Sequence, residues 1–447
     1  MHWEQKVAFA ALSDIGFRRR NNQDSYSIQM APDPESWERN GHLFLVADGM
    51  GGHAVGELAS KMAADTIPHA YTKLSDESVE GALKRALEMG NDAIHERGEL
   101  NREFTRMGTT CTALVLGPQG AVVGHVGDSR CYRIRKGRID QLTFDHSLQW
   151  ELMRQGVMSP EEILRTEPRN VITRSLGPNP SVEVDVEGPL KVESNDVYLL
   201  CSDGLTCQVP DAEIGALAAN LSPTEACRAL VNLANLRGGP DNITVVIARV
   251  GAGGANAEEP PAADITPLAT STRLFQPFEL AGGGIAVGLF VIGALLISTD
   301  YGVMGHLLMA AANVLCGILI LLWIRRRRRD HLSSHIPVVS KGGPYRTASC
   351  ELTPQFLSSL STLEATVQRT AQEDGWLVDW ANYQGVREQA LTDLAARKHR
   401  DALRNLARGL QFLMEGIQQL RRQRDQAQKW GPRPAAGGDD PAAQPHG

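Results

Sequence analysis

Four aspartates lie where apolar runs of this sequence end or begin, and a fifth candidate lies near the N-terminus. Asp48, Asp128 and Asp203 follow "LFLVA", "GHVG" and "YLLCS" directly. Asp241 stands in "GGPDN" before the apolar run "ITVVIARV", and Asp24 stands in "NNQDS" near the N-terminus. A turn explains any one of them, because Asp and Gly are common where strands end. If these strands lie in adjoining sheets, however, their ends bring several carboxylates into one space.

Carboxylates that meet repel each other unless a cation lies between them. Oxygen ligands without His or Cys suit Mg²⁺ or Mn²⁺ better than zinc. Two such ions lower the pKa of a bridging water and hold a phosphate for attack. The arginines of "RRRNNQD", just before Asp24, are planar donors that suit a phosphate. The pattern therefore predicts metal-assisted hydrolysis of a phosphate ester.

Composition and the remaining motifs argue against several other classes of protein. The net charge of -7 gives no basic excess for nucleic acid. None of the seven cysteines has an arginine six positions later, and no Gly-Lys dipeptide occurs, so neither a cysteine phosphatase loop nor a nucleotide P-loop is visible. No pair of cysteines shows C-x-x-C spacing, which argues against a zinc or redox pair and favours a reduced, cytosolic setting.

The elements that must position the aspartates are predicted by short β-branched runs and by helical periodicity. Helices are expected over 55–67, 77–96 and 223–236. The tight links at 117–120 and 136–137 predict that 109–143 forms an antiparallel meander. Residues 1–250 therefore read as one α+β domain, with antiparallel sheets covered by helices. Strands are expected at "HLFLVA", "TCTALVLG", "AVVGHVG", "CYRIR", "VYLLCS" and "ITVVIARV".

At this point the sequence resembles the metal-dependent type-2C (PPM) serine/threonine protein phosphatases, especially the bacterial ones. The resemblance runs through nearly all of residues 7–250 in order. It implies an antiparallel β-sandwich flanked by helices, an α-β-β-α arrangement, with the metals at one end. The motifs that carry it are "SDIGFRRRNNQD", "VADGMGGHAVGELAS", "MGTTCTALVL", "GHVGDSRCYRIRKGRIDQLTFDHS", "NVITRSLG", "LLCSDGLT" and "GGPDNITVV".

The resemblance also implies roles for individual residues. Arg19 would bind the substrate phosphate, His53 would protonate the leaving oxygen, and a metal-bridging hydroxide would attack. Asp48 would bridge two Mn²⁺ or Mg²⁺ ions, and a third, weaker ion is implied at Asp128. The implied metal ligands are Asp24, Asp48, Gly49, Asp128, Asp203 and Asp241.

Two positions depart from the family pattern, and two roles have plainer alternatives. Gln23 stands where many members have Glu, which puts the strength of the second metal site in question. His53 lies five residues after Asp48, farther than in some relatives, and its alternative is a loop histidine bonded to the backbone. The alternative for Arg19 is a solvated surface arginine. The rival for the whole protein is a catalytically weak regulator that binds phosphoproteins and signals through its C-terminal helices.

Residues 251–447 lie beyond the resemblance and are interpreted from hydropathy and periodicity alone. A flexible linker is expected at 251–279. Residues 280–299 and 303–324 are free of charge and long enough to cross a hydrocarbon core of about 30 Å, so a two-span hairpin is expected over 280–324. The alternative is one span plus one buried helix. "RRRRR" opens a basic juxtamembrane segment, 325–351, that the positive-inside rule places in the cytoplasm together with the N-terminal domain.

A helical domain is expected at 352–430, followed by a disordered tail at 431–447. Leucine and isoleucine recur there at alternating spacings of three and four, from Leu403 to Leu420. The flanking positions lack opposed charges, so an intramolecular helix pack is favoured over a coiled coil. The expected partners are phosphorylated proteins, serine/threonine kinases and the membrane, with a helix-mediated partner or self-association through 403–420 as a further expectation.

Overall fold

The computed structural model describes residues 7–51, 53–74, 76–104, 106–157, 171–251, 310 and 343–430. The described residues of 7–251 and of 343–430 belong to one compact unit. The linker predicted at 251–279, the spans predicted at 280–299 and 303–324, and the tail predicted at 431–447 lie outside the described residues, Gly251 and Ala310 excepted. Within the described ranges, no helix has both the length and the apolar character needed to cross a bilayer.

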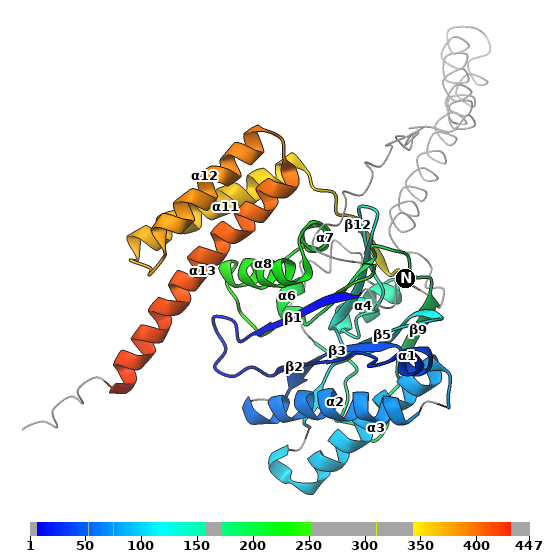
Figure 1. The fold of residues 1–447 in the computed structure, drawn as a ribbon. Coiled ribbons are helices and arrows are strands. Elements are labelled where there is room, and N and C mark those ends of the chain that lie inside the picture. Colours follow the sequence, from blue (N-terminus) through cyan, green and yellow to red (C-terminus); the bar gives the residue numbers. More distant parts are fainter. Residues whose placement is uncertain are drawn as a thin grey trace, which may run out of the picture. The chain divides into compact units, whose positions relative to one another are not determined.

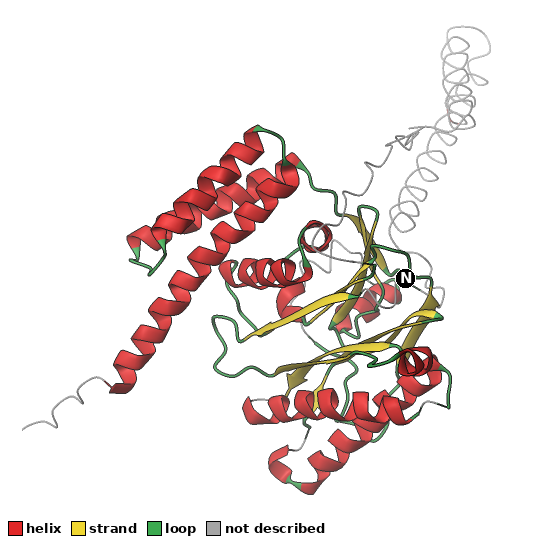
Figure 2. Ribbon diagram, in the orientation of Figure 1, coloured by secondary structure: helices red, strands yellow, loops and turns green. Residues whose placement is uncertain are grey.

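Two antiparallel sheets form the centre of this unit (Figures 1 and 2). One sheet has the order β2 (Asp24–Gln29), β3 (His42–Met50), β5 (Cys111–Gly117), β6 (Gly120–Val126) and β9 (Asp185–Leu190), with β4 (Gly108–Thr109) pairing β3. The other has the order β1 (Ala8–Asp14), β11 (Ile243–Arg249), β10 (Val197–Cys201), β7 (Arg130–Arg135), β8 (Arg138–Gln141) and β12 (Arg346–Ser349).

Strand β3 shows how the sheets build a layered core. Successive side chains of a strand point to opposite faces of its sheet. Leu43, Leu45 and Ala47 pack in the cluster shared with helices α2 (His53–Lys73) and α3 (Val79–Leu100). Phe44 and Val46 pack in the cluster between the two sheets. Both faces of β3 are thus buried, which is why its sequence reads as a continuous apolar run.

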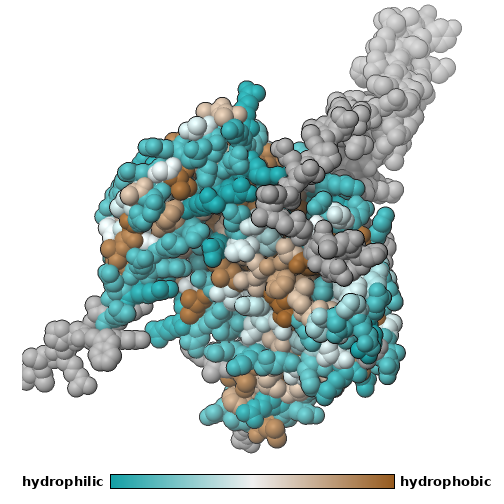
Figure 3. Space-filling model, in the orientation of Figure 1, coloured by the Kyte–Doolittle hydropathy of each residue, from teal (hydrophilic) through white to brown (hydrophobic). Residues whose placement is uncertain are grey.

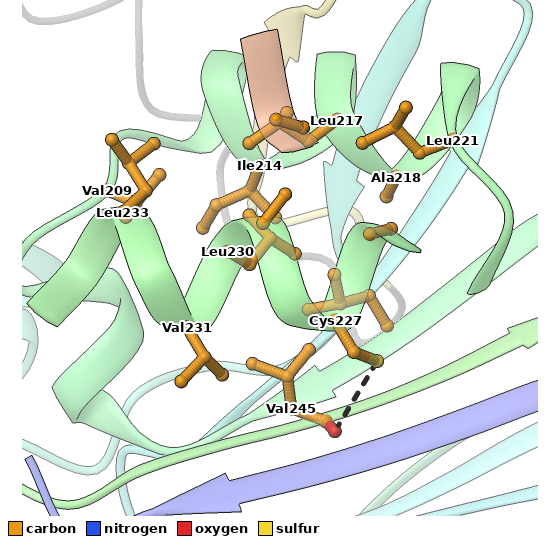
Figure 4. Close-up of a cluster of buried hydrophobic side chains, with 14 of the residues drawn as sticks. Val209, Ile214, Leu217, Ala218, Leu221, Cys227, Leu230, Val231, Leu233 and Val245 are labelled. Carbon is orange, nitrogen blue, oxygen red and sulfur yellow. Dashed lines mark hydrogen bonds between the residues drawn. The ribbon is translucent and has the colours of Figure 1, made fainter. Parts of the chain in front are cut away.

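Helices cover the outer faces of both sheets. The second sheet is covered by α7 (Asp211–Asn220) and α8 (Pro223–Leu236), whose apolar side chains interlock in Figure 4. Ser222 and Glu225 form a capping box at the start of α8. The predicted α-β-β-α arrangement of this part is confirmed. The shorter helices are α1 (Pro34–Asn40), α4 (Leu148–Arg154), α6 (Asp203–Thr206) and a 3₁₀ turn at Arg102–Phe104.

All six predicted strands and the three predicted helices form, but the predicted meander over 109–143 is wrong. The hairpins β5–β6 and β7–β8 exist, yet β6 pairs with β9 in one sheet and β7 with β10 in the other. The chain changes sheets at residues 127–129. Gly127 has φ +117°, a conformation that L-residues with a side chain rarely adopt, and a Cβ there would lie 2.5 Å from Thr110 Cβ.

The C-terminal region forms three helices, α11 (Pro354–Glu373), α12 (Trp380–Ala395) and α13 (His399–Trp430), as predicted for 352–430. Leu403, Leu406 and Leu410 are buried in the same cluster as α7 and α8, so the leucine stripe packs within the chain. Strand β12, inside the segment predicted as basic and juxtamembrane, pairs antiparallel with β8. Residues 343–430 therefore extend the core formed by residues 7–251 and share its hydrophobic cluster.

Hydrophilic residues predominate on the face shown in Figure 3, and hydrophobic ones gather there in smaller patches. The apolar side chains of the described residues concentrate in four buried clusters: one between the sheets, one under α2 and α3, one shared by α7, α8 and the C-terminal helices, and a smaller one among those C-terminal helices. Burial of apolar surface in these layers is the main stabilising contribution to such a fold. It also fixes the strand ends that carry the aspartates.

Candidate active site

An acidic pocket of about 540 Å³ lies where strands of both sheets end. The predicted residues that line it lie at the ends of strands or in the loops next to those ends. Besides the aspartates, three consecutive arginines from the loop between β1 and β2 contribute to its wall. The predicted site residues that line the pocket are Arg19, Asp48, Gly49, Asp128, Asp203 and Asp241.

Asp24 lies next to this pocket, buried, at the start of β2. It is the register partner of Asp48 across the β2–β3 pair. Its Oδ2 accepts a hydrogen bond of 2.7 Å from Ser202 Oγ, which precedes Asp203. Ser202 in turn accepts a bond of 3.0 Å from the backbone N–H of Thr244 on β11. One serine therefore connects the acidic residues of both sheets.

Asp48 and Gly49 are held by backbone contacts at the end of β3. The Asp48 N–H donates to Thr110 Oγ1 at 2.9 Å, and the Gly49 N–H donates to the Gln23 carbonyl at 3.1 Å. A Cβ on residue 49 would lie 2.0 Å from the Gly56 carbonyl oxygen. Only glycine allows this approach, since the obstructing atom belongs to the backbone. The glycine that follows Asp48 thus lets helix α2 begin against the strand end.

Burial and mutual repulsion raise the pKa of four of these carboxyl groups. For Asp48 and Asp128 the pKa lies well above its ordinary value, first because of burial and then because of neighbouring aspartates. Burial raises the pKa of Asp24 to about 7, although the hydrogen bond from Ser202 opposes the shift. Burial and the Asp241 charge raise the pKa of Asp203 to about 6. Charged carboxylates in this pocket call for a compensating cation.

The donor set fits a hard divalent ion. Asp24 Oδ1 and Asp128 Oδ1 are buried and have no hydrogen-bond partner among the residues the structure describes. Buried oxygens of this kind need a partner, and a cation is one. Carboxylate and carbonyl oxygens are the ligands that Mg²⁺ and Mn²⁺ favour. Within the described ranges, no three acidic, histidine or cysteine side chains are grouped as in a formed metal site.

Arg19 reaches into the acidic pocket, as predicted, and contacts one of its carboxylates. Its Nη2 lies 2.7 Å from Asp241 Oδ2, and 47% of the Arg19 side chain is exposed. A guanidinium in this place can present two donors to a phosphate that enters from solvent. His53 is the first residue of α2, just after the pocket-lining Gly51. Its side chain lies outside the described residues, so its predicted role stays a prediction.

Comparison with known proteins decides the family. A sequence profile described as "Protein phosphatase 2C" matches residues 18–227. The "Serine/threonine phosphatase stp" of Listeria welshimeri is 35% identical over 240 residues, which are 53% of this chain and 92% of that protein. The chain belongs to the protein phosphatase 2C family. Members of this family are metal-dependent serine/threonine phosphatases that use Mn²⁺ or Mg²⁺.

Two further relatives of this protein phosphatase 2C chain cover the same region. "Protein phosphatase PhpP" of Streptococcus pneumoniae is 36% identical over 246 residues, which are 54% of this chain and 96% of that protein. A solved structure of the catalytic domain of the phosphatase PstP, in complex with two manganese ions, is 34% identical. It covers 55% of this chain and 98% of that domain, with a TM-score of 0.46.

The sequence reasoning missed two residues that organise the phosphatase 2C site. Asn242 donates to the carbonyls of Ile15 at 2.9 Å and Asn21 at 3.0 Å, and accepts from the Gln23 N–H at 2.9 Å. It therefore ties both ends of the loop that carries Arg19 to the start of β11. Ser202 is the second, through its bond to Asp24. Both are neighbours of predicted ligands in the quoted motifs "LLCSDGLT" and "GGPDNITVV", and that adjacency was the available signal.

Proposed function

We propose that this chain hydrolyses phosphoserine and phosphothreonine esters of proteins in a reaction that depends on Mn²⁺ or Mg²⁺. The observation that supports this proposal is the pocket in which Arg19 lies among Asp48, Asp128, Asp203 and Asp241. An anion-binding guanidinium beside a cluster of carboxylates suits a ligand that is itself a metal-bound anion. A pocket that only bound phosphate would be built more simply from cations, because carboxylates repel that ligand.

The carboxylates of the pocket and the Gly49 carbonyl offer oxygen atoms to the metal ions. Asp203 and Asp241 would hold the first metal, Asp48 would serve both ions, and the Gly49 carbonyl would be a further ligand. Asp24, bonded to Ser202, would serve the second ion directly or through water. When bound, the ions neutralise charge on the phosphate and lower the pKa of a water. Asp128, whose buried Oδ1 has no hydrogen-bond partner in the described part of the chain, would hold a third, weaker ion.

The remaining roles belong to side chains that contact the substrate. Arg19 orients the phosphate by paired N–H donors, and it must leave Asp241 in part to do so. His53, the first residue of α2, would donate a proton to the leaving serine or threonine oxygen. Asn242 keeps the Arg19 loop at the distance that these contacts require.

The test is hydrolysis of a phosphothreonine peptide by the full-length protein with added Mn²⁺. We expect Asp203→Asn to lower kcat by at least about 100-fold, as for loss of a central electrostatic group. Asp92→Asn, the same change at an exposed position of α3, should act like the wild type. If the wild type is no more active than Asp203→Asn but still binds the phosphopeptide, the result refutes the enzymatic function and supports the regulator.

We further propose that the protein is anchored at the cytoplasmic membrane by the hairpin at 280–324. The uncharged runs and the arginines at 325–329 support it. The catalytic domain and the C-terminal helices would then both face the cytoplasm, where serine/threonine kinases would be its opponents. Reporter fusions after residue 250 and after residue 335 should both score as cytoplasmic. Opposite readings for the two fusions would rule out two spans.

A further inference from the structure

The long C-terminal helix α13 reaches the loop that carries Arg19. The guanidinium carbon of Arg421 lies 4.1 Å from the centroid of the Phe17 ring. Its Nη2 donates a hydrogen bond of 3.2 Å to the Phe17 carbonyl oxygen, across 404 positions of sequence. Phe17 precedes Arg19 by two residues, so a helix outside the family match contacts the segment that presents the phosphate-binding arginine.

This loop is held from two sides. On one side, the N–H groups of Phe17 and Arg18 donate to the Gly239 carbonyl at 2.8 and 3.2 Å, close to Asp241. On the other side, Arg421 covers the ring and carbonyl of Phe17. The Arg19 side chain is nearly half exposed, and its ion pair within the described residues is with Asp241, at 2.7 Å. The direction of its long side chain therefore depends on how firmly the backbone of the loop is placed.

Helix α13 is anchored well away from this contact. Leu403, Leu406 and Leu410 are buried in the cluster shared with α7 and α8. Arg404 and Arg408 lie 3.4 and 3.6 Å from the Glu225 carboxylate at the start of α8. At 1.5 Å per residue, Arg421 projects about 16 Å beyond Leu410. A continuous helix with a fixed base is stiff enough to hold the loop at its far end.

We propose that Arg421 is a positioning residue of the phosphatase reaction. By stacking on Phe17 it holds the loop so that Arg19 faces the phosphate. This inference rests on the function proposed above. The C-terminal helices thereby contribute to substrate binding without contacting the substrate, and a partner that displaced α13 would weaken binding of phosphoproteins. The base of α13 is buried elsewhere, so loss of the Arg421 side chain leaves the fold intact.

The first experiment compares Arg421→Ala with Arg422→Ala in the full-length protein. Arg422 is the next residue of α13, also exposed, and its removal changes the net charge equally. With a phosphothreonine peptide and saturating Mn²⁺, we expect Arg421→Ala to raise KM by about two- to fivefold, the worth of an exposed cation–π contact. The kcat and the melting temperature should stay close to the wild type, and Arg422→Ala should leave KM unchanged. An unchanged KM in Arg421→Ala, or a change confined to the melting temperature, overturns the inference.

The second experiment asks whether Arg421 acts through Phe17. Phe17→Leu should raise KM by the same factor, and the double variant should show no further increase, because both changes remove one contact. Additive effects would contradict the inference. Asp203→Asn serves as the reference in the same assay. If the wild type is clearly more active than Asp203→Asn, the proposed function stands whatever the result for Arg421→Ala. If the two activities are equal, both the proposed function and the inference are overturned.

Discussion

Arg19 and Asp241 form an ion pair with 2.7 Å between Nη2 and Oδ2, in a pocket that also contains Asp48 and Asp203. The pair joins the loop before β2 to the turn before β11. It connects the group expected to bind phosphate with a carboxylate expected to bind metal. Binding of phosphate to Arg19 and binding of metal to Asp241 both change this ion pair, so the two binding equilibria should be coupled.

Removal of Arg19 should change both equilibria in opposite directions. Arg19→Ala deletes a paired donor for phosphate, so KM for a phosphopeptide should rise about tenfold or more. It also removes a positive charge beside Asp241, so the dissociation constant for Mn²⁺ should fall, because a cation is then repelled less. Steady-state kinetics and calorimetric titration with Mn²⁺ measure the two effects. Arg39→Ala, an exposed arginine paired with Glu35 on α1, is the control. A fall in metal affinity would count against the coupling.

Loss of Asn242 should loosen the Arg19 loop and destabilise the fold. Asn242→Ala removes three hydrogen bonds from a buried side chain, and the loop groups left without partners cost about 2 kcal/mol or more. KM should rise together with this loss. Urea unfolding and kinetics provide the readouts. Asn220→Ala, which removes one bond to the Ala216 carbonyl on α7, should cost about 1 kcal/mol and leave KM alone. If the variant is as stable as the wild type and has a normal KM, Asn242 does not support the Arg19 loop.

The C-terminal helices and the phosphatase core should unfold together. Leu406→Ala creates a cavity in the cluster shared by α13, α7 and α8, which should cost about 2–5 kcal/mol. Calorimetry should show one transition of the compact unit at a lower temperature, because the cluster belongs to both segments. Leu391→Ala, at a position 49% exposed on α12, should shift it far less. Two separate transitions, only one of them shifted, would contradict a shared core.

The buried Glu364 should make stability depend on pH. Burial against α13 raises the pKa of Glu364 from 4.5 to about 7, while the Arg387 charge opposes the shift. Between these values the unfolded chain releases a proton that the folded chain keeps, so this contribution to stability is full below pH 4.5 and is lost as pH rises to 7. The loss amounts to about 3 kcal/mol at most.

Glu364→Gln provides the control for that prediction, since the amide does not titrate. The difference in unfolding free energy between wild type and variant should decline from pH 4.5 to 7 and then level off above pH 7. Urea unfolding at a series of pH values gives this difference directly. A difference that stays constant over the range would show that Glu364 keeps its ordinary pKa in the folded protein.

Local patterns of sequence predicted six of the strands and three of the helices individually. The apolar, β-branched runs became β3, β5, β6, β7, β10 and β11, and helical spacing located α2, α3 and α8. Such patterns succeed because burial of one face, or of both, imposes a period of 2 or 3.6 on each element separately. The aspartates at strand ends were predicted to converge, and all but Asp24 line one pocket while Asp24 lies beside it.

Pairing between distant segments could not be predicted in the same way. The meander over 109–143 failed because tight hairpins fix only neighbouring strands, and the turn at Gly127 sends the chain to the other sheet. Nothing in the pattern of residues 346–349 indicated that they would pair with β8. The roles of Ser202 and Asn242 were likewise hidden, since each depends on partners more than 170 positions away.

Residue types and the spacing within single segments were enough to predict the family, the chemistry of the acidic residues, six strands and three helices. The folded chain was needed to show that the C-terminal helices share a core with α7 and α8, and that Arg421 stacks on Phe17, close in sequence to Arg19. Sequence spacing does not reveal such contacts because they come from the packing of complementary surfaces. Many apolar stripes could satisfy that packing, and the spacing within one stripe does not specify its partner.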